Sequence, residues 1–138
     1  MKSKESYSLT SFVLLIIGCI DLLRGFLHTF QVNWASSTFA HLDLTVARSD
    51  QLWLLGTFGI SNILTGLLYI LISRKAKELS PYVLIIIPIA YLLGIIGLRT
   101  SGIFPDADFL GKYFIAFYLG ACVVTSAIFF GKKYFKRK

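Results

Sequence analysis

The sequence has 138 residues, room for one ordinary domain, and its composition excludes a water-soluble globule and a disordered chain. Hydrophobic residues make up 56% and charged residues 15%, whereas a soluble domain carries about 25% charged residues. The net charge of +7 is typical of nucleic-acid-binding proteins, so the positive residues must be located before that charge is interpreted.

Four stretches are long and apolar enough to cross a bilayer, which takes about 20 residues of α-helix. These spans cover about residues 9–30, 51–73, 81–98 and 113–131. Loops 31–50 and 99–112 join the first span to the second and the third to the fourth. The predicted fold class is therefore all-α: an integral membrane four-helix bundle, with residues 1–138 forming a single transmembrane domain.

Local signals predict where three helices begin. Ser80 followed by Pro81 is typical of an N-cap with proline in the first helical position, and Asp50 can cap the second span. Within the first loop, Ser37 can cap a short amphipathic helix that lies over the mouth of the bundle. Such a segment is either an interfacial connector or a lid on an outer cavity.

Lysine and arginine residues predict the orientation in the membrane. Ten of the 14 lie in the N-terminal tail, the loop after the second span and the C-terminal tail. Only Arg48, Arg99 and Lys112 lie in the other two loops. Because cytoplasmic loops are enriched in these residues, we expect both termini to be cytoplasmic in a multi-pass protein of the bacterial inner membrane. The expected partner of the basic fringe is membrane lipid and not nucleic acid, and a homo-oligomer is left open.

The first span contains three polar residues on one helical face. Around a helix, Arg24 lies about 60° and His28 about 20° from Asp21. A charged group in lipid costs at least about 3 kcal/mol, so this face is expected to point into the bundle or a wet cavity. Asp21 and Arg24 are three residues apart and can pair.

The second span repeats this pattern. Gly18 and Gly25 align with Gly59 and Gly66, and Asp21 aligns with Asn62. Glycines let two helix backbones come close in membranes, so packing through glycine faces explains the match without a duplication. An internal duplication is the alternative.

Several polar residues are predicted to lie at mid-membrane depth: Asp21, Arg24, Asn62, Tyr91 and Thr125. One interpretation is a hydrogen-bonded network that determines how the helices pack. The other is a polar pocket or a proton-sensitive site. The predicted ligand-binding residues are Asp21, Arg24, His28, Asn62 and Tyr91. In this set Arg24 can hold an anionic group and His28 can titrate near neutral pH.

Motifs for catalysis and cofactors are absent from the sequence. It has no Ser-His-Asp, Walker or Rossmann pattern, so we predict no catalytic residue. A lone intramembrane histidine disfavours haem, and no cofactor is predicted. Cys19 and Cys122 lie in apolar runs and are expected to be small buried residues. The residues that could approach a metal at the outer face lack ligand spacing: His28, His41, Asp43, Asp106 and Asp108.

Gly18, Leu22, Gly25 and His28 form the pattern G-x-x-x-L-x-x-G-x-x-[polar] in the first span. In this motif and in its architecture the chain resembles DoxX-like four-helix bacterial membrane proteins. The resemblance implies cytoplasmic termini and a membrane component sometimes linked to redox or quinone processes. The Asp21–Arg24 pair is outside that pattern, and no catalytic residue is transferred.

Three functions are compatible with these features. The leading hypothesis is a polar intramembrane cavity, open to the outer face, that binds and could transport a small or lipid-like molecule or a proton. An assembly subunit whose polar stripe only holds helices together is the alternative. A membrane enzyme acting on lipid or quinone is a third hypothesis.

Overall fold

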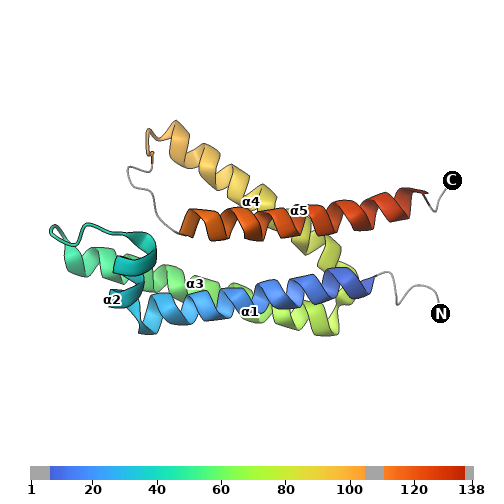
Figure 1. The fold of residues 1–138 in the computed structure, drawn as a ribbon, viewed down its shortest axis with the longest axis horizontal. Coiled ribbons are helices and arrows are strands. Elements are labelled where there is room, and N and C mark those ends of the chain that lie inside the picture. The colour runs from blue at the N-terminus through green and yellow to red at the C-terminus, as the bar shows by residue number, and fades with distance from the viewer. Residues whose placement is uncertain (1–6, 105–110, 136–138) are drawn as a thin grey trace.

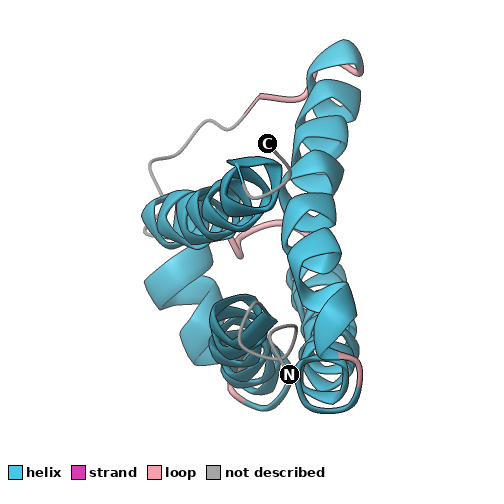
Figure 2. Cartoon of the chain, turned by 90° about the vertical axis from the view of Figure 1, so that its right-hand side faces the viewer, coloured by secondary structure: helices cyan, strands magenta, loops and turns pink. Residues whose placement is uncertain are grey.

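The computed structural model describes residues 7–104 and 111–135, and this part of the chain is helical without a β-strand (Figures 1 and 2). Its four long helices are α1 (Ser8–Phe30), α3 (Arg48–Lys75), α4 (Ser80–Thr100) and α5 (Gly111–Phe135). The short elements are α2 (Val32–Ala35), the π-helical η2 (Ser36–Ala40) and the 3₁₀ turn η3 (Lys77–Leu79).

All four long helices are long and apolar enough to cross a membrane, and they coincide with the four stretches predicted from the sequence. Each helix extends beyond its predicted limits by at most four residues. The helices α1 and α4 end, and α3 and α5 begin, at what we call the loop end of the molecule. We call the opposite end, where α1 begins and α5 stops, the terminal end (Figure 1).

The predicted helix caps are wrong. The helix α4 already begins at Ser80 with Pro81 in its first turn, and the Ser80 hydroxyl has no hydrogen-bond partner in the described residues. The helix α3 begins at Arg48, because the carbonyl of Ala47 accepts the first helical bond, and this places Asp50 inside the first turn. The hydroxyl of Ser37 donates to the carbonyls of Asn33 and Trp34 behind it, within a helical segment already begun at Val32.

The helices α1 and α3 pack against each other through their glycines. A Cβ atom added to Gly18 would lie 2.9 Å from the carbonyl oxygen of Gly66, and one added to Gly25 would lie 2.7 Å from that of Gly59. These separations are below van der Waals contact, so only glycine allows the two backbones to approach this closely. The predicted glycine packing is therefore present, and it joins two helices of one chain in antiparallel order.

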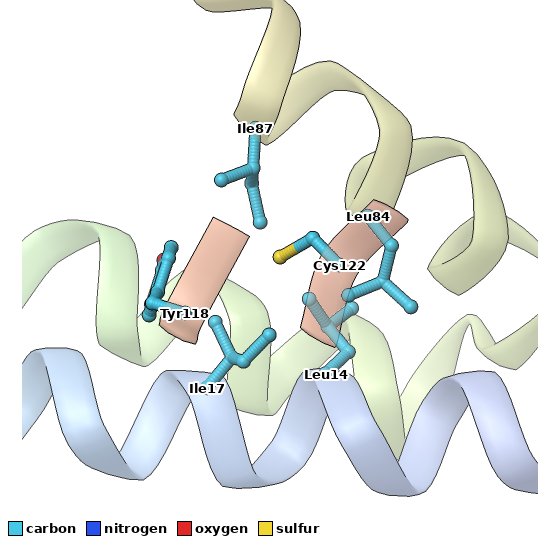
Figure 3. Close-up of a cluster of buried hydrophobic side chains, with 6 residues drawn as sticks. All are labelled: Leu14, Ile17, Leu84, Ile87, Tyr118 and Cys122. Atoms are coloured by element: carbon cyan, nitrogen blue, oxygen red, sulfur yellow. The ribbon is translucent and has the colours of Figure 1, made fainter. Parts of the chain in front are cut away.

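A second helix pair, α4 and α5, lies over α1 and forms the apolar core with it (Figure 3). This core contains Leu14 and Ile17 of α1, Leu84 and Ile87 of α4, and Tyr118 and Cys122 of α5. Cys122 is buried as predicted, but the expectation for Cys19 is wrong. Cys19 follows Gly18 by one residue, about 100° around the helix, and this turns it away from α3 to the exposed surface.

Towards the loop end, α4 diverges from α5 (Figure 1). Tyr91 is the last half-buried residue of α4, and residues 92–100 are all exposed. The helix α3 packs mainly on α1 and has only sparse contacts with α4 and α5. At the same end, Phe39 of η2 contacts the ring of Phe114, with ring centroids 6.5 Å apart, so the short helices cover the α1–α5 side (Figure 2).

Candidate functional site

Asp21 and Arg24 of α1 form the ion pair expected from their spacing. An oxygen of Asp21 (Oδ1) lies 3.4 Å from Nη2 of Arg24, and the Asp21 side chain is 3% exposed. The second carboxylate oxygen of Asp21 accepts a hydrogen bond of 3.0 Å from the hydroxyl of Tyr118 on α5. One carboxylate oxygen (Oδ2) is therefore hydrogen-bonded, whereas the other (Oδ1) faces the guanidinium at ion-pair distance without accepting a hydrogen bond.

The guanidinium of Arg24 joins three helices. Its Nη2 donates to Oδ1 of Asn62 on α3 at 2.7 Å and to the hydroxyl of Tyr91 on α4 at 3.4 Å. The ring of Phe58, also on α3, lies 5.5 Å from the guanidinium carbon, within the range of a cation–π interaction. We call Asp21, Arg24, Asn62, Tyr91 and Tyr118 the polar cluster.

The polar cluster links the two helix pairs beside the apolar core. Since α3 makes only sparse contacts with α4, the guanidinium of Arg24 bridges the space between Asn62 and Tyr91. The carboxylate of Asp21 makes the matching link from α1 to α5 through Tyr118. Each long helix thus contributes at least one residue to the polar cluster.

His28 lies beside the polar cluster, on its loop-end side. Its imidazole is stacked near Phe58, with ring centroids 5.8 Å apart. Among the described residues, no hydrogen bond joins His28 to Asp21 or Arg24, although the three share a helical face. The ring of Phe58 therefore lies next to both His28 and Arg24.

Three buried nitrogen atoms in and beside the polar cluster lack hydrogen-bond partners within residues 7–104 and 111–135. They are Nε of Arg24, Nδ2 of Asn62 and Nδ1 of His28. The first two can only donate hydrogen bonds. Asn62 is just 4% exposed, and a buried donor without an acceptor costs about 1–3 kcal/mol. Oδ1 of Asp21 also lacks a hydrogen-bond partner in these residues, so the polar cluster has two unused donors and one unused acceptor.

The structure brings together four of the five predicted mid-membrane residues. Thr125 is the exception: it is buried on α5, but in the described part of the chain no hydrogen bond connects it to the polar cluster. The sequence analysis missed Tyr118 and Phe58. Tyr118 is four residues before Cys122 and seven before Thr125, so its position on the same helical face was a usable signal.

The loop between η2 and α3 is organised by local hydrogen bonds. The carboxylate of Asp43 accepts bonds from the hydroxyl of Thr45 at 2.6 Å and from its backbone N–H at 3.0 Å. These bonds lower the pKa of Asp43. In the described ranges no three His, Cys, Asp or Glu side chains gather closely enough to hold a metal ion. Two loop candidates, Asp106 and Asp108, lie outside the described residues.

Comparison with known proteins assigns no family to this chain. No family model matches the sequence, and no curated protein or solved structure gives a significant match. The resemblance to DoxX-like proteins therefore stays a prediction. The function has to be argued from the polar cluster and its surroundings.

Proposed function

We propose that this chain is a multi-pass membrane protein that binds a small or lipid-like molecule in a polar intramembrane cavity open to the outer face. The residues assigned to this cavity are Asp21, Arg24, His28, Asn62 and Tyr91. Transport of the bound molecule, or of a proton, is a further step that such a site would permit. In the proposed orientation the loop end faces outward and both termini lie in the cytoplasm of a bacterial cell.

The unused donors of Arg24 and Asn62 are the observation that carries this proposal. A hydrogen-bond network that serves helix packing alone is most stable when each buried polar group has a partner, because an unpaired group in hydrocarbon costs free energy. Here Nη2 of Arg24 donates to Oδ1 of Asn62, but Nε of Arg24 and Nδ2 of Asn62 have no hydrogen-bond partner in the described residues. An acceptor brought by a ligand would satisfy both donors.

The position of the polar cluster also favours access from the loop end. Arg24 is six residues from Phe30, the last residue of α1, which corresponds to about 9 Å along the helix axis. Its side chain is 23% exposed, whereas that of Asp21 is 3% exposed. His28 lies one helical turn nearer to the loop end. The polar face of α1 therefore leads from the loop end towards the middle of the helix.

A helix-packing role is the second candidate, and specific contacts favour it. Arg24 bonds to Asn62 and Tyr91, and Asp21 accepts from Tyr118, so the polar cluster joins all four long helices. In this alternative the chain is an assembly subunit of a membrane complex. Gly59 and Gly66 both pack against α1, so a partner chain would have to bind another surface.

Cysteine accessibility distinguishes the two candidates. Phe58→Cys and Ile60→Cys are made in a background carrying Cys19→Ala and Cys122→Ala, and intact cells are treated with a charged thiol reagent that cannot cross membranes. Phe58 contacts Arg24 and His28, whereas the exposed side chain of Ile60 is only two residues away on another face.

We expect the reagent to modify Phe58→Cys and not Ile60→Cys, because the thiolate must be in water to react. Modification of Phe58→Cys should also slow when Arg24 carries an added lipid-like ligand. If neither cysteine is modified, the polar cluster has no opening to the outer solution and the packing role is the better account.

A further inference from the structure

The polar cluster is electrically balanced before any ligand arrives. The carboxylate of Asp21 lies 3.4 Å from the guanidinium of Arg24, and both belong to one turn of α1. The remaining members, Asn62, Tyr91 and Tyr118, are uncharged amide and phenol side chains. Two donors of the cluster, Nε of Arg24 and Nδ2 of Asn62, have no acceptor in the described chain, and Oδ1 of Asp21 lies 3.4 Å from the guanidinium without accepting a hydrogen bond.

This balance selects against a charged ligand. An anionic group placed beside the Asp21–Arg24 pair would leave one uncompensated negative charge within the membrane. Such a charge costs at least about 3 kcal/mol. An uncharged carbonyl or ester oxygen accepts the same hydrogen bonds without that cost.

Exposed apolar side chains adjoin the site on one side. Tyr91 marks the point where α4 diverges, and beyond it residues 92–100 are exposed and mostly apolar. On α3, Leu54 is exposed in the same half of the molecule. The guanidinium of Arg24 lies between Asn62 of α3 and Tyr91 of α4, the two helices with only sparse mutual contacts. A ligand held there would have its polar group at Arg24 and its tail along exposed apolar side chains.

We propose that the ligand is an uncharged amphipathic lipid, which enters from the bilayer between α3 and α4 and places a carbonyl oxygen at Arg24 and Asn62. This inference rests on the proposed function and specifies its ligand class. The ring of Phe58 covers the guanidinium, and its half-exposed side chain has to swing aside to admit the carbonyl.

Lipid retention by the purified full-length protein tests this inference. The detergent-solubilised protein is incubated with diacylglycerol or with phosphatidic acid of identical acyl chains, and bound lipid is measured by native mass spectrometry. The two lipids share ester carbonyls and differ in the charged phosphate. The variants are Asn62→Leu, which removes the unpaired donor, and Ser61→Ala, a control at the exposed neighbouring position.

We expect the wild-type protein and Ser61→Ala to retain diacylglycerol in preference to phosphatidic acid. Asn62→Leu should retain it about tenfold less, as expected for one buried hydrogen bond. A preference of the wild-type protein for phosphatidic acid overturns the uncharged-ligand inference even if a variant fails to fold. If Asn62→Leu and Ser61→Ala retain equal amounts of diacylglycerol, the lipid carbonyl does not bind at Asn62 and the proposed binding position is wrong. In both cases modification of Phe58→Cys still decides whether the proposed cavity exists.

Discussion

At the scale of single residues, the stability of the polar cluster depends on how the charge of the Asp21 carboxylate is compensated. A carboxylate in the low dielectric of a membrane protein is tolerated only where other groups compensate its charge. Arg24 and Tyr118 supply this compensation from α1 and α5. Of these two partners, the hydroxyl of Tyr118 can be removed without changing the net charge of the polar cluster.

Tyr118→Phe removes that hydrogen bond and keeps the ring. We expect the free energy of unfolding to fall by about 2 kcal/mol, because a buried charged acceptor loses its donor. Unfolding in mixed detergent micelles measures this change. Tyr82→Phe is the matched control, since the half-exposed Tyr82 contributes a ring contact with Phe130 and should lose almost nothing.

The stability of the turn at Asp43 should depend on pH only in the acidic range. Hydrogen bonds from Thr45 lower the pKa of Asp43 below its usual value of 3.8. A depressed pKa means that the turn is stabilised above the ordinary pKa and loses this support as pH falls through the lower folded value. The carboxyl ¹³C shift of Asp43 should therefore titrate below that of Thr45→Ala. Identical midpoints in the two proteins would contradict the role of Thr45.

Helical periodicity was sufficient to place Asp21 and Arg24 on one face and to predict their ion pair. It could not identify Tyr118 as the partner, because that contact depends on how α5 crosses α1. The position of Cys19 was missed for a related reason. Hydrophobicity alone does not tell a residue facing lipid from one facing another helix.

At the scale of helices, the close approach of α1 and α3 is the feature most sensitive to substitution. The backbones meet at Gly18 with Gly66 and at Gly25 with Gly59, on either side of the Asp21 and Asn62 level. This pairing holds Asn62 near Arg24, so glycine packing and the polar cluster depend on each other.

Gly25→Ala should destabilise the protein by about 2 kcal/mol, because the new methyl group would meet the backbone of α3 at 2.7 Å. Gly120→Ala on α5 is the control, since nothing lies within 4 Å of its added Cβ atom. Thermal unfolding of both variants in one detergent provides the comparison. Equal loss of stability in the two proteins would show that the α1–α3 contact is looser than described.

Hydropathy predicted the four long helices nearly to their ends, since membrane length and apolar content are properties of each segment alone. The capping residues in the sequence predicted the first residue of each helix less well. At Ser80 and Asp50 the backbone begins the helix earlier, and the expected side-chain caps do not form. The divergence of α4 beyond Tyr91 has no signature in hydropathy, because exposed and buried faces of this helix are equally apolar.

At the scale of the whole molecule, the distribution of positive charge predicts the orientation. We expect Ser101→Cys to react with a membrane-impermeant maleimide in intact cells, and Lys77→Cys to react only after the cells are opened. Both positions are exposed and lie at opposite ends of α4 and its preceding turn. Replacing Cys19 and Cys122 by alanine removes background labelling. The reverse pattern would place the termini outside.

The central claim is that the unpaired donors of the polar cluster open to an outer cavity. Water-edited solid-state NMR of the protein in phosphatidylcholine bilayers tests it most directly, by measuring magnetisation transferred from water to Nε of Arg24 and Nδ2 of Asn62. We predict transfer to both buried nitrogens that is slower than to the exposed loop residue Thr45 but well above the transfer to the exposed apolar side chain of Leu64. If Arg24 and Asn62 receive as little magnetisation from water as Leu64, the polar cluster is closed to water and serves helix packing.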